Sequence, residues 1–268
     1  MAASFKKYFR VWKISARATL MQRMAFRFNF LLIVFGVFMQ MALSIIFIKV
    51  IFGFIKNISG WNFNQALIVV ASYMLVEGLN WALFAMLAGI PMSIKLGFLD
   101  RLIIKPMSTQ FLISVWRADP EDWGRVITAV LVFIYALGGL AMAPLEIVVN
   151  GVFYLFLIAC ASIITYSLTL MIKSLGFFFT ETNTLWLLVN QTIRVSQYPT
   201  DIFFHKTVRI FFSTIVPLAF MATVPAKIFL HGFDFKLIAF SIVLALIFFI
   251  ASRKFWKFSL RHYSSASS

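Results

Sequence analysis

The stretch from Phe28 to Ile48, FNFLLIVFGVFMQMALSIIFI, decides the class of fold. It continues for 21 residues without a charged side chain. A helix rises about 1.5 Å per residue, so a run of this length crosses the roughly 30 Å hydrocarbon core of a bilayer. The sequence therefore predicts a membrane protein whose first transmembrane helix is this run.

The composition extends this prediction to the whole chain. Hydrophobic residues make up 62% of the sequence and its mean hydropathy is +0.94, well above the roughly 45–50% apolar share of a soluble domain. In 268 residues, spans of about 20 residues leave room for about six helices and no sizeable soluble domain. We expect an all-α polytopic fold with one transmembrane domain over residues 1–268.

The net charge of +15 is concentrated at the ends of the chain. Basic residues that flank apolar spans mark cytoplasmic ends, where anionic lipids attract them. A lipid bilayer, and not a nucleic acid, is therefore the expected partner of this charge. The flanking residues are Lys6, Lys7, Arg10, Lys13, Arg17, Arg23 and Arg27 before the first span, and Arg253, Lys254, Lys257 and Arg261 after the last.

Apolar periodicity divides the chain into spans and two irregular segments. Residues 1–27 predict a helix that lies in the membrane interface, because apolar residues recur at helical spacing between basic ones. Further spans are expected at about 65–88, 126–141, 147–172, from 185 onward, and 237–251. Residues 90–125 are too charged to cross a bilayer and are assigned to the cytoplasm, whereas residues 198–230 predict short re-entrant helices at the outer side.

The distribution of basic residues predicts the orientation. Segments assigned to the cytoplasm hold 17 basic residues and outer segments hold seven. The positive-inside rule then places both termini in the cytoplasm.

Motifs for catalysis and for cofactor binding are missing from the sequence. There is no G-x-x-x-x-G-K-[ST] phosphate loop and no Gly-Lys pair, so we expect no ATP bound by this chain. The three histidines have no carboxylate or cysteine partners at ligand spacing, and Cys160 stands alone in an apolar run, so neither a metal site nor a disulfide is expected. A membrane enzyme or scaffold is correspondingly disfavoured.

Two features invite a functional interpretation. Glu77 lies near the middle of the second span, where an ionisable residue is costly and suggests a role in transport. It would attract a cationic substrate or, alternatively, pair with an amide or base of a neighbouring helix. The segment from Gly97 to Ser108 places Leu99, Leu102 and Ile103 on one helical face, which suits either a groove in a soluble partner or the lipid headgroups.

Several short stretches keep the order and spacing of a known family. They are Gly97-x-Leu99-Asp100-Arg101-Leu102-x-x-x-Pro106-x-Ser108, Tyr198-Pro199-x-Asp201-Ile202-Phe203 with Arg209 downstream, Ile215-x-Pro217-x-Ala219-Phe220 with Pro225-Ala226, and the tail Tyr263–Ser267. Over almost its whole length the chain resembles ATP-binding cassette (ABC) permeases of the type-2 exporter class, which usually pair two related membrane subunits with one ATPase. Val224 replaces an expected tyrosine, and the residues from Lys95 to Gly97 depart from a more polar pattern.

This resemblance implies a mechanism and a set of partners. The helix between the second and third spans would be a coupling helix that docks on a separate ABC ATPase, with Leu99, Leu102 and Ile103 packing and Asp100 and Arg101 orienting the contact. ATP and Mg²⁺ would bind to that ATPase, and this chain would be a non-catalytic transport subunit. A second permease subunit, identical or related, would complete the pathway.

The resemblance also implies a location and a cargo class. The protein would be an exporter in a bacterial cytoplasmic (inner) membrane, moving a small or amphipathic substrate. The outer region with Tyr198, Pro199, Asp201, Arg209 and Pro217 would cap the pathway, with Asp201 and Arg209 as a candidate pair. The alternative is an ion-coupled secondary transporter, which should show internal repeats that this sequence does not display.

Overall fold

A computed structural model describes residues 2–25, 27–116, 119, 122–179, 183–202 and 217–263 of the chain. These residues form helices joined by turns, with no strand among them apart from an isolated bridge between Ile58 and Trp61. The all-α prediction is confirmed.

In the part of the chain that the structure describes, four helical segments are long and apolar enough to cross a membrane, so the protein is a multi-pass membrane protein. They are Phe28–Phe54 in α2 (Arg27–Phe54); Phe63–Lys95, made of α3 (Phe63–Phe84), η1 (Ala85–Gly89) and α4 (Ile90–Lys95); Pro144–Phe177, made of α8 (Pro144–Ser174) and η3 (Leu175–Phe177); and Phe235–Arg261, which is α12.

Two further apolar segments are shorter. α7 (Trp123–Leu137) corresponds to the expected third span, and its 15 residues reach about 22 Å at 1.5 Å per residue. Ala219–His231 is formed by a π-helical turn, η6 (Ala219–Thr223), followed by α11 (Val224–His231). α9 (Asn183–Arg194) stands where the fifth span is expected and has only 12 residues.

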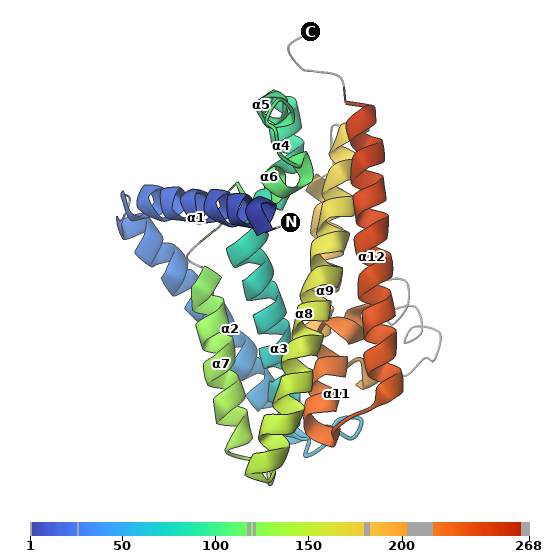
Figure 1. Cartoon of the computed structure of the whole chain (residues 1–268). Coiled ribbons are helices and arrows are strands. Elements are labelled where there is room, and N and C mark those ends of the chain that lie inside the picture. The colour runs from blue at the N-terminus through green and yellow to red at the C-terminus, as the bar shows by residue number, and fades with distance from the viewer. Residues whose placement is uncertain are drawn as a thin grey trace.

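The first helix, α1 (Ala2–Ala25), crosses the direction of the long helices α8 and α12 at a steep angle (Figure 1). This is the orientation expected for a helix in the plane of the interface. The ring of Tyr8 packs edge-on against Phe111 at 4.6 Å, and the hydroxyl of Tyr8 accepts a hydrogen bond from the backbone N–H of Ser108 at 3.4 Å. α1 is thereby attached to the segment that follows the second span.

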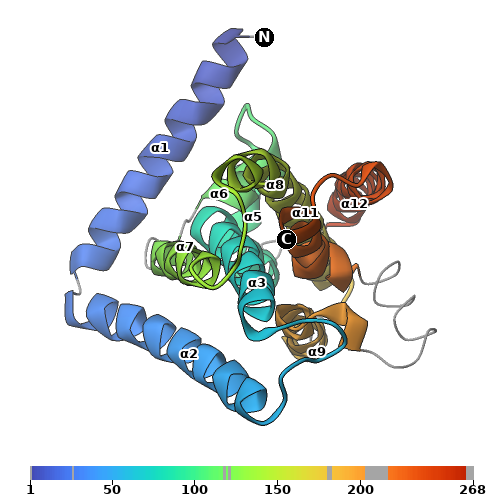
Figure 2. The same ribbon diagram turned by 90° about the horizontal axis from the view of Figure 1, so that it is seen from below.

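α3 occupies the centre of the helix bundle, between α2, α7, α8 and α9 (Figure 2). Residues Leu67 to Ala71 are all fully buried, which means that α3 is covered on every face, as expected of a helix that is apolar all round. Close approach of α7 depends on Gly78, because a Cβ there would lie 3.0 Å from the Cβ of Arg125.

A second apolar cluster stabilises one end of the molecule. It joins α4, α5 (Phe98–Ile103) and α6 (Thr109–Val115) to the ends of α8 and α12. Gly97 precedes α5 with a φ of 66°, a left-handed conformation that favours glycine. In Figure 1 this end also holds the last turns of α12. The buried members are Leu87, Ile90, Leu99, Leu102, Leu112, Ile113, Leu170 and Trp256.

Two boundaries differ from the sequence-based expectation, for identifiable reasons. α12 extends from Phe235 to Arg261, ten residues past the expected end at Ala251, because Trp256 and Ser259 continue its buried face beyond the first basic residues. Arg125, expected in the cytoplasmic segment, lies within α7 and pairs with a residue of α3.

Candidate translocation site

An ion pair joins α3 and α7 inside the helix bundle. Arg125 Nη1 lies 3.1 Å from Glu77 Oε2, and Arg125 Nε lies 2.8 Å from Asp122 Oδ1. The side chains of Glu77 and Arg125 are each only 15% exposed. One guanidinium group thus provides a counter-charge for two carboxylates at a depth where a lone charge is costly.

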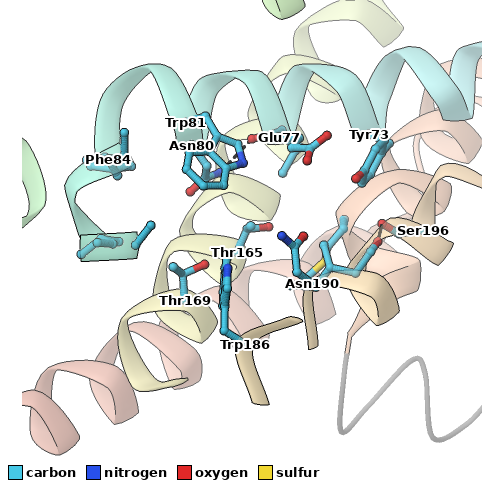
Figure 3. Close-up of a pocket in the computed structure, with 16 residues that line it drawn as sticks. Tyr73, Glu77, Asn80, Trp81, Phe84, Thr165, Thr169, Trp186, Asn190 and Ser196 are labelled. Atoms are coloured by element: carbon cyan, nitrogen blue, oxygen red, sulfur yellow. Dashed lines mark hydrogen bonds between the residues drawn. The ribbon is translucent and has the colours of Figure 1, made fainter. Parts of the chain in front are cut away.

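Tyr73 lies one helical turn before Glu77, on the same face of α3. Continuing along the same face of α3 come Asn80, Trp81 and Phe84 (Figure 3). This spacing of three or four residues places polar and aromatic side chains in one stripe.

The stripe forms one wall of a narrow cavity of about 50 Å³. Across the cavity stand Thr165 and Thr169 of α8 and Trp186 and Asn190 of α9 (Figure 3). The ring of Trp186 makes a cation–π contact with Lys173, whose Nζ lies 4.5 Å from the ring centroid. The side chain of Lys173 is buried. The lining therefore combines aromatic rings with amide and hydroxyl groups, which suits an amphipathic ligand.

A second, more polar cavity of about 100 Å³ shares Tyr73 and Glu77 with the first. Both cavities therefore meet at the Glu77–Arg125 pair. The lining of this polar cavity is Gln40, Met41, Ser44, Tyr73, Met74, Glu77, Arg125, Arg194 and Gln197.

The geometry bears on the two readings of Glu77. The ion pair with Arg125 agrees with the reading in which Glu77 pairs with a base of a neighbouring helix. The pair also neutralises the carboxylate, which weakens the physical case for attraction of a cationic substrate. Its assignment to a translocation pathway stays a prediction.

The carboxylate of Asp201 connects segments around the predicted outer region. Asp201, in η5 (Thr200–Ile202), lies 2.8 Å from Lys227 Nζ of α11 and accepts a hydrogen bond from Trp61 Nε1 at 3.1 Å. Among the described residues Asp201 therefore pairs with Lys227, and the expected partner Arg209 lies outside them. Tyr198 and Pro199 line a small apolar cavity beside Trp61, after the short η4 (Val195–Gln197).

The structure shows how far each residue of the expected coupling helix is buried by this chain itself. Leu99 and Leu102 are fully buried by this chain's own second cluster, so they cannot present their side chains to a partner in this conformation. Ile103 is 40% exposed and Arg101 is exposed as well. An amphipathic pattern shows that one face is covered but does not identify what covers it, so docking of an ATPase on this helix stays a prediction.

Candidate metal ligands do not gather in the described part of the chain, where no group of three or more His, Cys, Asp or Glu residues forms. Cys160 is buried in the main apolar core.

A multi-pass helical bundle with polar cavities at the level of its spans defines the class of a membrane transport protein. A family model described as "ABC-2 family transporter protein" matches residues 38–267, and the chain belongs to that family. Membership supports an ABC-type permease subunit, and the family implies association with an ABC ATPase. No curated protein and no solved structure matches the chain.

Sequence reasoning identified Glu77 but missed the residues around it. Arg125 was assigned to the cytoplasm because it lies at the edge of an apolar run, and Tyr73 carried no signal beyond its spacing of four from Glu77. Arg194 interrupts the apolar run that begins near Leu185. A basic residue within an otherwise apolar segment is the signal that would have found it.

Proposed function

We propose that this chain is the membrane-spanning permease subunit of an ATP-driven ABC exporter for a small or amphipathic substrate. A separate ATPase binds ATP and Mg²⁺ and performs the hydrolysis, so this chain is not catalytic by itself. The observation that carries the proposal is the pair of adjoining cavities, one aromatic and one polar, that share Tyr73 and Glu77 inside a chain of the ABC-2 family.

The surface proposed for ATPase docking is the exposed side of α4, α5 and the turn that follows. Its apolar residues are Met92 (57% exposed), Leu96 (67%), Ile103 (40%) and Ile104 (83%). Leu99 and Leu102 lie on the opposite, buried side of α5 and fix its position by packing in the second cluster. Closure of the ATPase moves the spans only if its affinity differs between the two states of the permease.

α1 connects this surface to the first long helix. Lys7 Nζ donates to the carbonyl of Pro106 at 3.3 Å, and Tyr8 contacts Phe111. Since α1 is followed directly by α2, a displacement of the docking surface is transmitted to the first span through these contacts. α1 is accordingly a second element of the coupling surface.

A second permease subunit, identical or related, completes the pathway. α2 leaves much of its apolar surface uncovered by this chain, with Phe35 and Leu43 62% and 59% exposed. The proposed site is the bacterial cytoplasmic (inner) membrane with both termini in the cytoplasm, which agrees with the positions of α5 and the last turns of α12 at one end of the bundle (Figure 1).

The test is affinity purification of the tagged protein in mild detergent from its native cells, with identification of the co-purifying chains and an ATPase assay. We expect an ABC ATPase with the wild type, and a loss of about tenfold or more in its recovery with Ile104→Asp, because a charge in an apolar contact is unfavourable. Phe233→Asp, at a side chain 59% exposed and remote in sequence from the docking surface, is the matched control.

Leu99→Asp serves a different purpose here, as a reference for loss of folding, since Leu99 is in the core. If the wild type purifies without an ATPase and ATP leaves it unaffected, the proposal fails and an ion-coupled transporter becomes the leading alternative.

A further inference from the structure

Arg194, the last residue of α9, faces the polar cavity without a carboxylate of its own. Within the described ranges no acidic side chain forms an ion pair with it, whereas Glu77, on the wall of the same cavity, is already engaged by Arg125 at 3.1 Å. A half-buried guanidinium at this depth is costly unless an anion accompanies it.

The charges around the two cavities leave an excess of cations. Arg125 satisfies both nearby carboxylates, since it contacts Glu77 and Asp122 together. Lys173 adds a further buried cation behind Trp186, and that ring also lines the narrow cavity. Among the described residues three cationic groups therefore lie in or beside the cavities with two carboxylates, and this excess of positive charge favours a negative ligand.

Neutral hydrogen-bond donors are present beside Arg194. Gln40 and Gln197 line the same cavity, and their side-chain amides make no hydrogen bond with the described residues. The hydroxyl of Ser44, by contrast, is already used, because it donates to the carbonyl of Gln40 at 3.1 Å. A guanidinium flanked by amide N–H groups matches the oxygen atoms of a carboxylate, sulfonate or phosphate.

An opening to this cavity lies along α2. Gln40 and Ser44 also line a wide groove of about 600 Å³ with Leu43, Phe47 and Tyr198. The rest of that lining is Ile46 and Val50, so the groove is mainly apolar. An amphipathic molecule can therefore approach through apolar surface and place its polar end at Arg194.

We propose that the polar cavity binds the anionic group of an amphipathic ligand, with Arg194 as its ion-pair partner and Gln40 and Gln197 as donors. The apolar part of the ligand lies in the apolar groove along α2. This inference rests on the proposed transport function and names its substrate class as amphipathic anions, with Glu77 as the counter-ion of Arg125 and not as the receptor of a cation.

Two probes with the same ring and opposite charge test this inference, namely naphthalene-2-sulfonate and 2-naphthyltrimethylammonium. Their affinities are measured by calorimetric titration of the purified permease–ATPase complex in neutral detergent. We expect the sulfonate to bind about tenfold or more tightly than the ammonium, and Arg194→Gln to remove that preference. Arg194→Lys should retain part of it, since the charge remains but the planar pair of donors is lost.

The control variant is Arg253→Gln, which removes one positive charge from the basic end of α12 and leaves the polar cavity unchanged. A second variant covers the case in which Arg194→Gln does not fold. Gln40→Glu introduces a carboxylate into the cavity next to Arg194, so it should lower sulfonate affinity without loss of thermal stability.

Equal binding of the two probes, or a sulfonate affinity unchanged in both Arg194→Gln and Gln40→Glu, overturns the inference. So does a covalent crosslink that pairs Arg194 with a carboxylate of the second subunit, because the anion would then be part of the protein. Failure of the transport proposal is distinguishable, since it appears as absence of the ATPase, whereas failure here leaves the complex intact.

The source of the anion is resolved in lipid nanodiscs. If phosphatidylglycerol weakens sulfonate binding relative to phosphatidylcholine, the same chemistry is supplied by a lipid headgroup. If the two lipids give equal sulfonate affinities, the site takes a soluble ligand. Either result retains an anion site at Arg194.

Discussion

Two carboxylate–cation pairs of similar geometry lie at different depths in this protein, and they are expected to differ in energy. Glu77–Arg125 joins α3 to α7 with 3.1 Å between the charged atoms, and both side chains are 15% exposed. Asp201–Lys227 joins η5 to α11, with 2.8 Å between Lys227 Nζ and Asp201 Oδ2. The side chain of Lys227 is 34% exposed and that of Asp201 is 23% exposed. The shorter pair is the more exposed one, so distance alone does not rank them.

The polarity of the surroundings determines which of the two pairs contributes more to stability. Coulomb attraction is screened by water and strengthened in a low-dielectric interior, where the cost of leaving one partner unpaired also rises. The inner pair is therefore a structural requirement of the helix bundle, whereas the outer pair contributes the modest energy of a surface ion pair. The predictions below measure this difference.

The largest effect is expected from Arg125→Leu. It leaves Glu77 charged and unpaired among apolar helices, and breaking a buried pair costs about 3–5 kcal/mol. We expect a loss of about 3 kcal/mol in the free energy of unfolding, measured by reversible denaturation in mixed micelles.

The double variant Glu77→Gln with Arg125→Gln is the control, because it removes both charges and should recover a large part of the loss. A loss below about 1 kcal/mol for Arg125→Leu, or a double variant no more stable than the single one, would contradict the assigned role of the pair.

The second prediction concerns the close approach that brings the inner pair together. A Cβ at position 78 would lie 3.0 Å from Arg125 Cβ and from Val126 Cγ2, so Gly78→Ala should separate α3 from α7 and destabilise the protein by about 1–3 kcal/mol. Gly36→Ala on α2 meets no atom within 4 Å and should instead stabilise its helix by about 0.5–1 kcal/mol. Opposite signs in a thermal denaturation series would support the packing argument, and equal signs would refute it.

Hydrophobic runs predicted the fold well because a span is a local property. Phe28 to Ile48 is uninterrupted in the sequence and continuous within α2. The end of α12 was misplaced because Arg253 interrupts the apolar run, although Trp256 beyond it is 2% exposed. A helix that leaves the bilayer and packs on its own protein has no hydropathy signal for its true end.

The candidate site was predictable only in part, since pairing is a non-local property. Glu77 was found because it is a charge within an apolar run, but its partner Arg125 lies 48 residues away at the first turns of α7. The pattern at Leu99 and Leu102 likewise indicates a face that is covered, and both side chains are fully buried. Which surface buries it, the chain itself or another subunit, depends on tertiary structure that periodicity does not contain.

The smallest effect is expected at the outer pair, and it completes the comparison. Asp201→Asn removes the negative charge opposite Lys227 but keeps an oxygen that accepts from Trp61 Nε1, so the unfolding free energy should fall by no more than about 1 kcal/mol. Raising the salt concentration to about 1 M, where the screening length is near 3 Å, should reduce even that difference. The effect of Arg125→Leu should persist at the same salt concentration, because ions do not enter the bundle. If instead both differences vanish together in salt, Glu77–Arg125 is open to water in the working protein, and the distinction between a structural inner pair and a screened outer pair is lost.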